Sequence, residues 1–272
     1  MANYGLSIDG VDISAPIMQR NPKSLSFSNY TGGRVSTSNS STDSLKECYV
    51  GDAAKTMVFA KKNSAKSTKV RFHRPDYDST VIIGDDALFL DIRGNKLYIV
   101  CKTPSLWSFI IGSDAGSISG AGNYGIRVYN SSGGVVYDSS FQSIKASRVI
   151  SLSSLNIKES IFLRGNNGVD VERRDVYIDS FTLTHNATNI GGGNYVRLGC
   201  SLASLCEKKF RSTSRSTPGT FLHSILVDSN GDLYAPLCVG VISNVVSYWD
   251  VDNQSPAIKM LGKLSNLLII KP

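Results

Sequence analysis

Charged residues, histidine and tryptophan are scarce in this chain, and long apolar runs are missing. Only 19% of its 272 residues are charged, and it contains three histidines and two tryptophans. Its longest apolar stretch, residues 264–270, is far too short to cross a bilayer as a helix. The N-terminus lacks a basic segment followed by an apolar one, so no signal peptide is expected. These absences predict no membrane span and a chain that is made and folded in a cytoplasm.

Spacings typical of catalytic or zinc sites are missing as well. The histidines, His73, His185 and His223, lie in no catalytic string, and there is no Gly-x-Ser-x-Gly elbow. The five cysteines form no CxxC pair, and an odd number without regular spacing does not indicate a disulfide framework. They are Cys48, Cys101, Cys200, Cys206 and Cys238. We therefore expect buried free thiols, no catalytic residue, no metal, no cofactor and no enzymatic activity.

Acidic pairs are present, and turns explain them more simply than catalysis or calcium binding does. Asp85 and Asp86 follow an apolar run, where a turn is expected, and Asp250 lies close to Asp252. Residues 228–232 resemble part of a calcium loop but lack the distal glutamate of an EF-hand. We interpret this segment as a hairpin turn.

The chain carries an excess of basic residues, but they do not form a pattern typical of a nucleic-acid-binding surface. Its 29 Lys and Arg against 22 Asp and Glu give a formal net charge of +7, with clusters in residues 61–74 and 208–215. A binding surface for nucleic acid usually adds exposed aromatic residues or a recognition helix, and neither pattern is present. We interpret the excess as solvated loop charge and expect no nucleic-acid partner.

Short apolar or alternating segments separated by Gly, Ser and Asn recur throughout the chain, which is typical of strands joined by tight turns. Hairpins are predicted over residues 88–101, 125–137, 161–171 and 224–241. Helical patterns are limited to residues 43–50 and 202–210. The sequence therefore predicts a mostly β fold with short helices and irregular loops.

One glycine-rich segment divides the predicted strands into two groups. Residues 112–122 contain four glycines and a single charged residue, which is typical of a linker. We therefore expect two β-sandwich-like domains, an N-terminal one over residues 1–111 and a C-terminal one over residues 123–272.

A six-residue pattern occurs twice in the chain. Residues 3–8 read NYGLSI and residues 123–128 read NYGIRV, and each is followed by a polar turn and a second apolar strand. In both copies a tyrosine alternates with leucine or isoleucine, so that aromatic and apolar side chains share one strand face. The repeat predicts that the two domains begin with related strand–turn–strand units.

The segment at residues 123–139, NYGIRVYNSSGGVVYDS, resembles the N-terminal motif of small tail-associated proteins of long-tailed bacteriophages. Members of that family begin with Met-Ala-Asn-Tyr-Gly and a hydrophobic residue, and a later apolar strand closes with Phe-Asp-Ser or Tyr-Asp-Ser. The N-terminal copy has this Met-Ala-Asn-Tyr-Gly start but continues to Ile13-Ser14-Ala15 where the closing triplet is expected. The resemblance implies a virion component at the tail or tail tip and no catalytic residue.

The sequence and its resemblance together predict a virion structural protein of the phage tail, synthesised in the cytoplasm of the host bacterium. It would form a symmetric trimer or ring and bind other tail proteins through exposed strands and aromatic anchors. The candidate motif and interface residues are Tyr4, Tyr124, Tyr129, Tyr137, Trp107 and Trp249.

Two alternatives stay open. In the first, the chain is a receptor- or carbohydrate-binding module at the tail tip, and Trp107 and Trp249 form a platform for host surface glycans. In the second, it is a capsid decoration protein, which differs from the tail hypothesis only in its location on the particle. A tail-borne enzyme that degrades polysaccharide is the weakest hypothesis.

Overall fold

The structure, a computed structural model of the 272-residue chain, describes residues 17–32, 44–67, 69–73, 80–119, 125–151, 157–158, 175–179, 182–183, 189–198, 201–206, 219–234, 236–242 and 266–272. In this part of the chain the regular structure is antiparallel β-sheet, and the mostly β fold class is confirmed. Helical structure in the described residues is limited to short 3-10 turns, among them η2 (Pro104–Leu106) and η3 (Ala115–Ser117).

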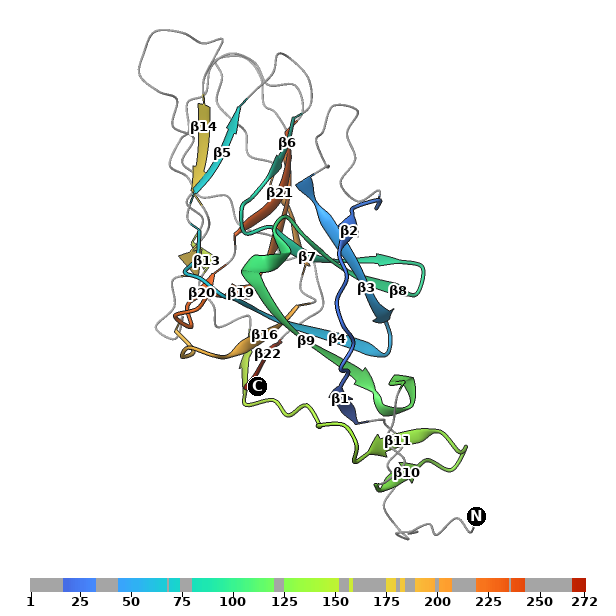
Figure 1. The fold of residues 1–272 in the computed structure, drawn as a ribbon. Helices are drawn as coiled ribbons and strands as arrows, with labels where there is room; N and C mark the ends of the chain where they lie inside the picture. Colours follow the sequence, from blue (N-terminus) through green and yellow to red (C-terminus); the bar gives the residue numbers. More distant parts are fainter. Residues whose placement is uncertain are drawn as a thin grey trace, which may run out of the picture.

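The largest sheet has six strands, and neighbouring strands in it come from distant parts of the chain (Figure 1). In spatial order they are β1 (Met18–Arg20), β9 (Trp107–Asp114), β4 (Thr56–Lys62), β16 (Tyr195–Leu198), β22 (Asn266–Ile270) and β12 (Arg148–Ser151). All neighbouring pairs are antiparallel.

The segment that we expected to be a linker begins inside this sheet. Gly112 belongs to β9 and pairs with Met57 on one side and Arg20 on the other. A Cβ at this position would lie 2.7 Å from Ile144 Cδ1, so close packing by a neighbouring side chain, and not chain flexibility, explains this glycine. The sheet takes strands from both sides of the expected boundary. Residues 120–122 lie outside the described residues.

A four-stranded sheet packs against the six-stranded one. Its spatial order is β2 (Ser28–Asn29), β3 (Lys46–Asp52), β8 (Lys96–Cys101) and β7 (Leu88–Arg93). The main core joins the two sheets, with Val50 and Ile99 from the smaller sheet packed with Val58 and Ile111 from the larger. Because each sheet buries one face against the other, this part of the molecule is sandwich-like.

The predicted hairpin at residues 88–101 is confirmed. Strands β7 and β8 pair from Leu88 with Cys101 to Arg93 with Lys96, which leaves Gly94 and Asn95 as a two-residue loop. Gly94 has a φ of 61°, the left-handed conformation that such tight loops require.

The remaining described strands form a second four-stranded sheet and several pairs. The sheet consists of β17 (Ser201–Cys206), β18 (Gly219–Ser224), β21 (Leu237–Ile242) and β6 (Thr80–Ile83). The pairs are β5 (Lys69–His73) with β14 (Asp175–Asp179), β13 (Ile157–Lys158) with β15 (Thr182–Leu183), β19 (Leu226–Val227) with β20 (Leu233–Tyr234), and β10 (Arg127–Tyr129) with β11 (Val135–Asp138).

These strands confirm two more predicted hairpins and correct both predicted helices. Strands β19 and β20 form the hairpin expected within residues 224–241, and β10 and β11 form the one at residues 125–137. The described parts of the two helical patterns, within residues 43–50 and 202–210, lie largely on β3 and β17, and each strand pairs along its length with a neighbouring strand. Residues 43 and 207–210 lie outside the described residues. The predicted hairpin at residues 161–171 lies outside the described residues.

Candidate functional site

The segment 125–139, which carries most of the internal motif copy, folds as the hairpin β10–β11 at one end of the described chain, beside β1 (Figure 1). Its loop is closed by Asn130, whose side-chain Oδ1 accepts hydrogen bonds from Gly134 N at 2.7 Å and from Ser132 Oγ at 2.9 Å. Asn130 N also donates to Gly134 O at 2.9 Å. Gly133 has a φ of 81°, so this glycine supplies the left-handed conformation that the turn requires.

The glycine at the start of the motif and the serine at its end contact each other. Ser139 Oγ accepts a hydrogen bond from Ile126 N at 2.8 Å, and Ser139 N donates to Ile126 O at 2.9 Å. A Cβ on Gly125 would lie only 2.4 Å from Ser139 Oγ. The spacing between Asn-Tyr-Gly and Tyr-Asp-Ser therefore has a structural cause, since the two ends close the hairpin base.

Asp138, the central residue of the closing triplet, is buried and fully engaged. Its carboxylate accepts hydrogen bonds from Arg127 Nε at 2.7 Å and from Ser140 N at 2.8 Å. Burial alone would raise the pKa of Asp138, but these hydrogen bonds and the Arg127 charge outweigh it and lower the pKa. The carboxylate is therefore charged at neutral pH and joins both strands.

Gln19 of β1 anchors the hairpin to the large sheet. Its side chain has no exposed surface, its Oε1 accepts from Asp138 N at 2.9 Å, and its Nε2 donates to Asp138 O at 2.6 Å and to Phe141 O at 2.8 Å. Ile17 N adds a backbone hydrogen bond to Val136 O at 2.9 Å. Sequence reasoning missed Gln19, because it lies 119 residues before Asp138 and no local pattern links them.

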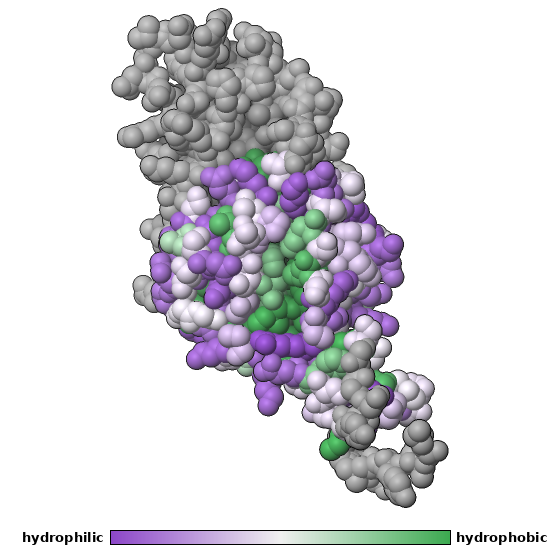
Figure 2. Space-filling view, in the orientation of Figure 1, coloured by the Kyte–Doolittle hydropathy of each residue, from purple (hydrophilic) through white to green (hydrophobic). Residues whose placement is uncertain are grey.

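The hairpin exposes apolar side chains although its base is fixed. Ile126 is 62% exposed and Tyr129 is 54% exposed, whereas Val136 is buried and Tyr137 is half-buried. Figure 2 shows apolar surface among polar atoms at this end of the described chain. The same view shows a larger apolar hollow in the middle of the molecule.

The other predicted site residues are not gathered with the hairpin. Trp107 begins β9 and is only 6% exposed within the main core, so little of its ring is available as a surface anchor. Its side chain lies on the core-facing side of β9, and its ring packs between the two sheets. Tyr4, Tyr124 and Trp249 lie outside the described residues.

A buried ionic network joins the end of β4, the segment before β7 and β20. Lys62 at the end of β4 pairs with Asp86, which also accepts hydrogen bonds from Tyr234 Oη at 2.9 Å and Ser67 N at 2.7 Å. Burial, together with the Asp86 charge, raises the pKa of Tyr234, so its hydroxyl stays protonated and donates. Both Asp86 oxygens have partners, and these contacts hold structural elements together.

The loop at residues 228–232 is a hairpin turn, as predicted. Asp228 is 1% exposed, and its carboxylate accepts hydrogen bonds from Asn230 N and Asp232 N, each at 2.9 Å, and from Lys66 N at 3.0 Å. Its oxygens are therefore engaged by backbone amides. Within the described residues, no three His, Cys, Asp or Glu side chains gather in a way that could hold a metal ion.

Three of the five cysteines are described at side-chain level, and all three are free and buried. Burial raises the pKa of Cys48, that of Cys101 to about 12 and that of Cys238 to about 11. This agrees with the prediction of buried free thiols for these three residues.

Comparison with known proteins adds no relative. The chain matches no protein-family model, no curated protein and no solved structure. Among the described residues, no helix is both long and apolar enough to cross a membrane.

Proposed function

We propose that the chain is a structural component of a bacteriophage virion, located at the tail or tail tip, that assembles with further copies of itself and with other tail proteins. The observation that carries this proposal is the hairpin β10–β11. It coincides with most of the segment that resembles the phage tail motif, its base is fixed by Gln19 and Asp138, and two of its apolar side chains, Ile126 and Tyr129, are exposed.

The hairpin has the properties of an assembly contact. A loop held by its own hydrogen bonds loses little conformational freedom on binding, which favours association. Burying a large apolar side chain contributes about 1.5–3 kcal/mol, and the hairpin offers two, Ile126 and Tyr129. In a symmetric assembly each copy would repeat this contact, so a small surface would be used several times.

The strand β12 offers a second contact. It forms one edge of the six-stranded sheet, and within the described chain its sole strand neighbour in that sheet is β22. Val149 on this strand is 53% exposed. An edge with an exposed apolar side chain can pair with a strand of another subunit through backbone hydrogen bonds.

The proposal is tested by removing the two exposed apolar side chains of the hairpin while keeping the backbone hydrogen bonds at its base and the Gln19 anchor. We expect the wild-type chain to sediment as an oligomer and the double variant Ile126→Ser with Tyr129→Ser to sediment as a monomer. Ile92→Ser is the matched control, because Ile92 is 58% exposed on β7, away from the hairpin. An oligomer that persists in the double variant, or that is lost equally in the control, would contradict the proposal.

A further inference from the structure

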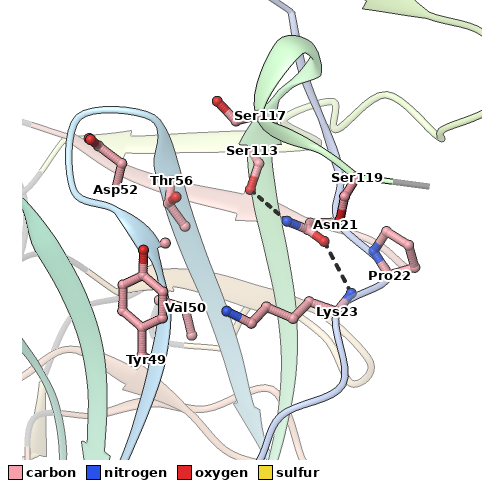
Figure 3. A pocket seen from close by; sticks show the side chains of 11 residues that line it. Asn21, Pro22, Lys23, Tyr49, Val50, Asp52, Thr56, Ser113, Ser117 and Ser119 are labelled. Atoms are coloured by element: carbon pink, nitrogen blue, oxygen red, sulfur yellow. Dashed lines mark hydrogen bonds between the residues drawn. The ribbon is translucent and has the colours of Figure 1, made fainter. Parts of the chain in front are cut away.

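A cleft of about 560 Å³ lies between the segment that follows β1, the strand β3 and the end of β9 with η3 (Figure 3). It is distinct from the hairpin surface. Its lining combines one exposed tyrosine ring with hydroxyl, amide, ammonium and carboxylate groups. A cleft of this size can hold a small organic ligand.

A β-bulge presents the tyrosine ring to this cleft. On β3, Tyr49 pairs with Tyr98, whereas Gly51 pairs with Leu97, so Val50 is the extra residue. Bulges redirect side chains and are frequent at binding sites. Here Val50 is buried in the core, and Tyr49 is 44% exposed.

A glycine and a threonine pack closely against each other in the wall of the cleft. A Cβ at Gly51 would lie 2.4 Å from Thr56 Oγ1, so any other residue there would push against the threonine. Both residues line the cleft.

Hydrogen bonds hold the polar groups of the rim in place. Asn21 Nδ2 donates to Ser113 Oγ at 3.1 Å, and its Oδ1 accepts from Lys23 N at 3.1 Å (Figure 3). The backbone N of Asn21 donates to Ile111 O at 2.8 Å. On the other side, Asp52 accepts from Ala54 N at 2.8 Å. The polar groups of Asn21 and Asp52 are therefore held in place before a ligand arrives, which limits the entropy lost on binding.

Lys23 supplies a charged donor beside the aromatic ring. Its Nζ lies 4.5 Å from the centre of the Tyr49 ring, and Figure 3 shows the ammonium group pointing toward that ring. The Lys23 side chain is exposed and has a flexible stem, so its ammonium group can move from the ring to a ligand oxygen.

We propose that this cleft binds a saccharide. Sugars have C–H faces that pack on an aromatic ring, since the ring face carries partial negative charge. Their many hydroxyls require both donors and acceptors, which Asn21, Lys23 and Asp52 provide together. Lys23 and Asp52 give the lining one positive and one negative side chain, so the cleft has no net charge that would select an anion such as a phosphate. The exposed serines Ser117 and Ser119 extend the polar lining toward solvent.

The test is saturation-transfer NMR on the full chain, using a panel of neutral saccharides built from glucose, galactose and N-acetylglucosamine. We expect at least one panel member to show transfer from the wild-type chain, and Tyr49→Ala to weaken its binding about tenfold or more. Tyr195→Ala is the matched control and should leave binding unchanged. Like Tyr49→Ala, this variant removes a tyrosine beside a lysine, because Lys61 Nζ lies 5.4 Å from the centre of the Tyr195 ring. Tyr195 itself does not line the cleft.

A second variant guards against an indirect effect of losing Tyr49. Ser117→Trp places a large side chain at an exposed position of the lining, and we expect it to block binding while the circular dichroism spectrum and melting temperature stay those of the wild type. No transfer from any panel member would overturn the proposal. So would transfer that survives both Tyr49→Ala and Ser117→Trp. Neither result depends on the assembly of the chain into a virion.

Discussion

Lys62 Nζ lies 2.5 Å from Asp86 Oδ1, and the two side chains are only 4% and 2% exposed. The pair joins three parts of the fold, because Lys62 ends β4 in the large sheet, Asp86 precedes β7 in the small sheet, and Tyr234 of β20 binds the same carboxylate. The neighbouring Asp85 pairs with Lys102 at 2.7 Å but is 56% exposed. Two adjacent aspartates therefore have very different environments.

We expect Asp86→Ala to lower the free energy of unfolding by about 3–5 kcal/mol, because it leaves the Lys62 charge buried without its partner. Asp85→Ala is the control, and an exposed pair of this kind is worth at most about 1 kcal/mol. Urea unfolding followed by circular dichroism measures both. Equal losses for the two variants would show that burial does not set the strength of these pairs.

Acid should open the motif hairpin through Asp138. Because folding lowers the pKa of this carboxyl, its contribution to stability is complete above the unfolded pKa of about 3.9 and is lost as the pH falls through the lower folded value. We expect the Ile126 and Ser140 amides to lose protection below about pH 4; hydrogen–deuterium exchange measures this as the rate in an unstructured peptide at the same pH divided by the observed rate.

Asp138→Asn provides the control for this effect. The amide cannot titrate, so the variant should lack the acid-dependent step and show the same relative protection of the hairpin amides across the same pH range. A step of the same size in the variant would assign the acid sensitivity to another group.

Cys48, Cys101 and Cys238 should resist alkylation while the chain is folded. Burial raises the pKa of each thiol, so little thiolate forms at about pH 8 and little reagent reaches it. We expect iodoacetamide to leave these three residues unmodified in the native chain and to modify them in urea, as read by peptide mass spectrometry. Rapid native labelling of Cys101 or Cys238 would contradict the observed packing.

Local patterns predicted local structure well. The loop of β7–β8 and that of β10–β11 both follow from glycine and asparagine between apolar segments, because these residues adopt the turn conformations on their own. The turn at residues 228–232 follows in the same way from Asp228, whose carboxylate binds the backbone just after it.

Contacts between distant segments could not be predicted in this way. The bonds from Gln19 to Asp138 and from Lys62 to Asp86 join residues that no spacing relates. Trp107 looked like an anchor because of its residue type, and its burial depends on the packing of two sheets. Tyr49 was not singled out at all, since the bulge that exposes it arises from the register of β3 against β8. Strand pairing likewise overrode the helical pattern of residues 43–50.

The proposal of a tail component is tested most directly by immunogold electron microscopy of intact phage particles, with an antibody raised against the recombinant chain. The account predicts gold on the tail, at or near its distal end. Gold on the head would favour a capsid decoration protein and contradict the tail assignment, and particles without any label would contradict an exposed virion component.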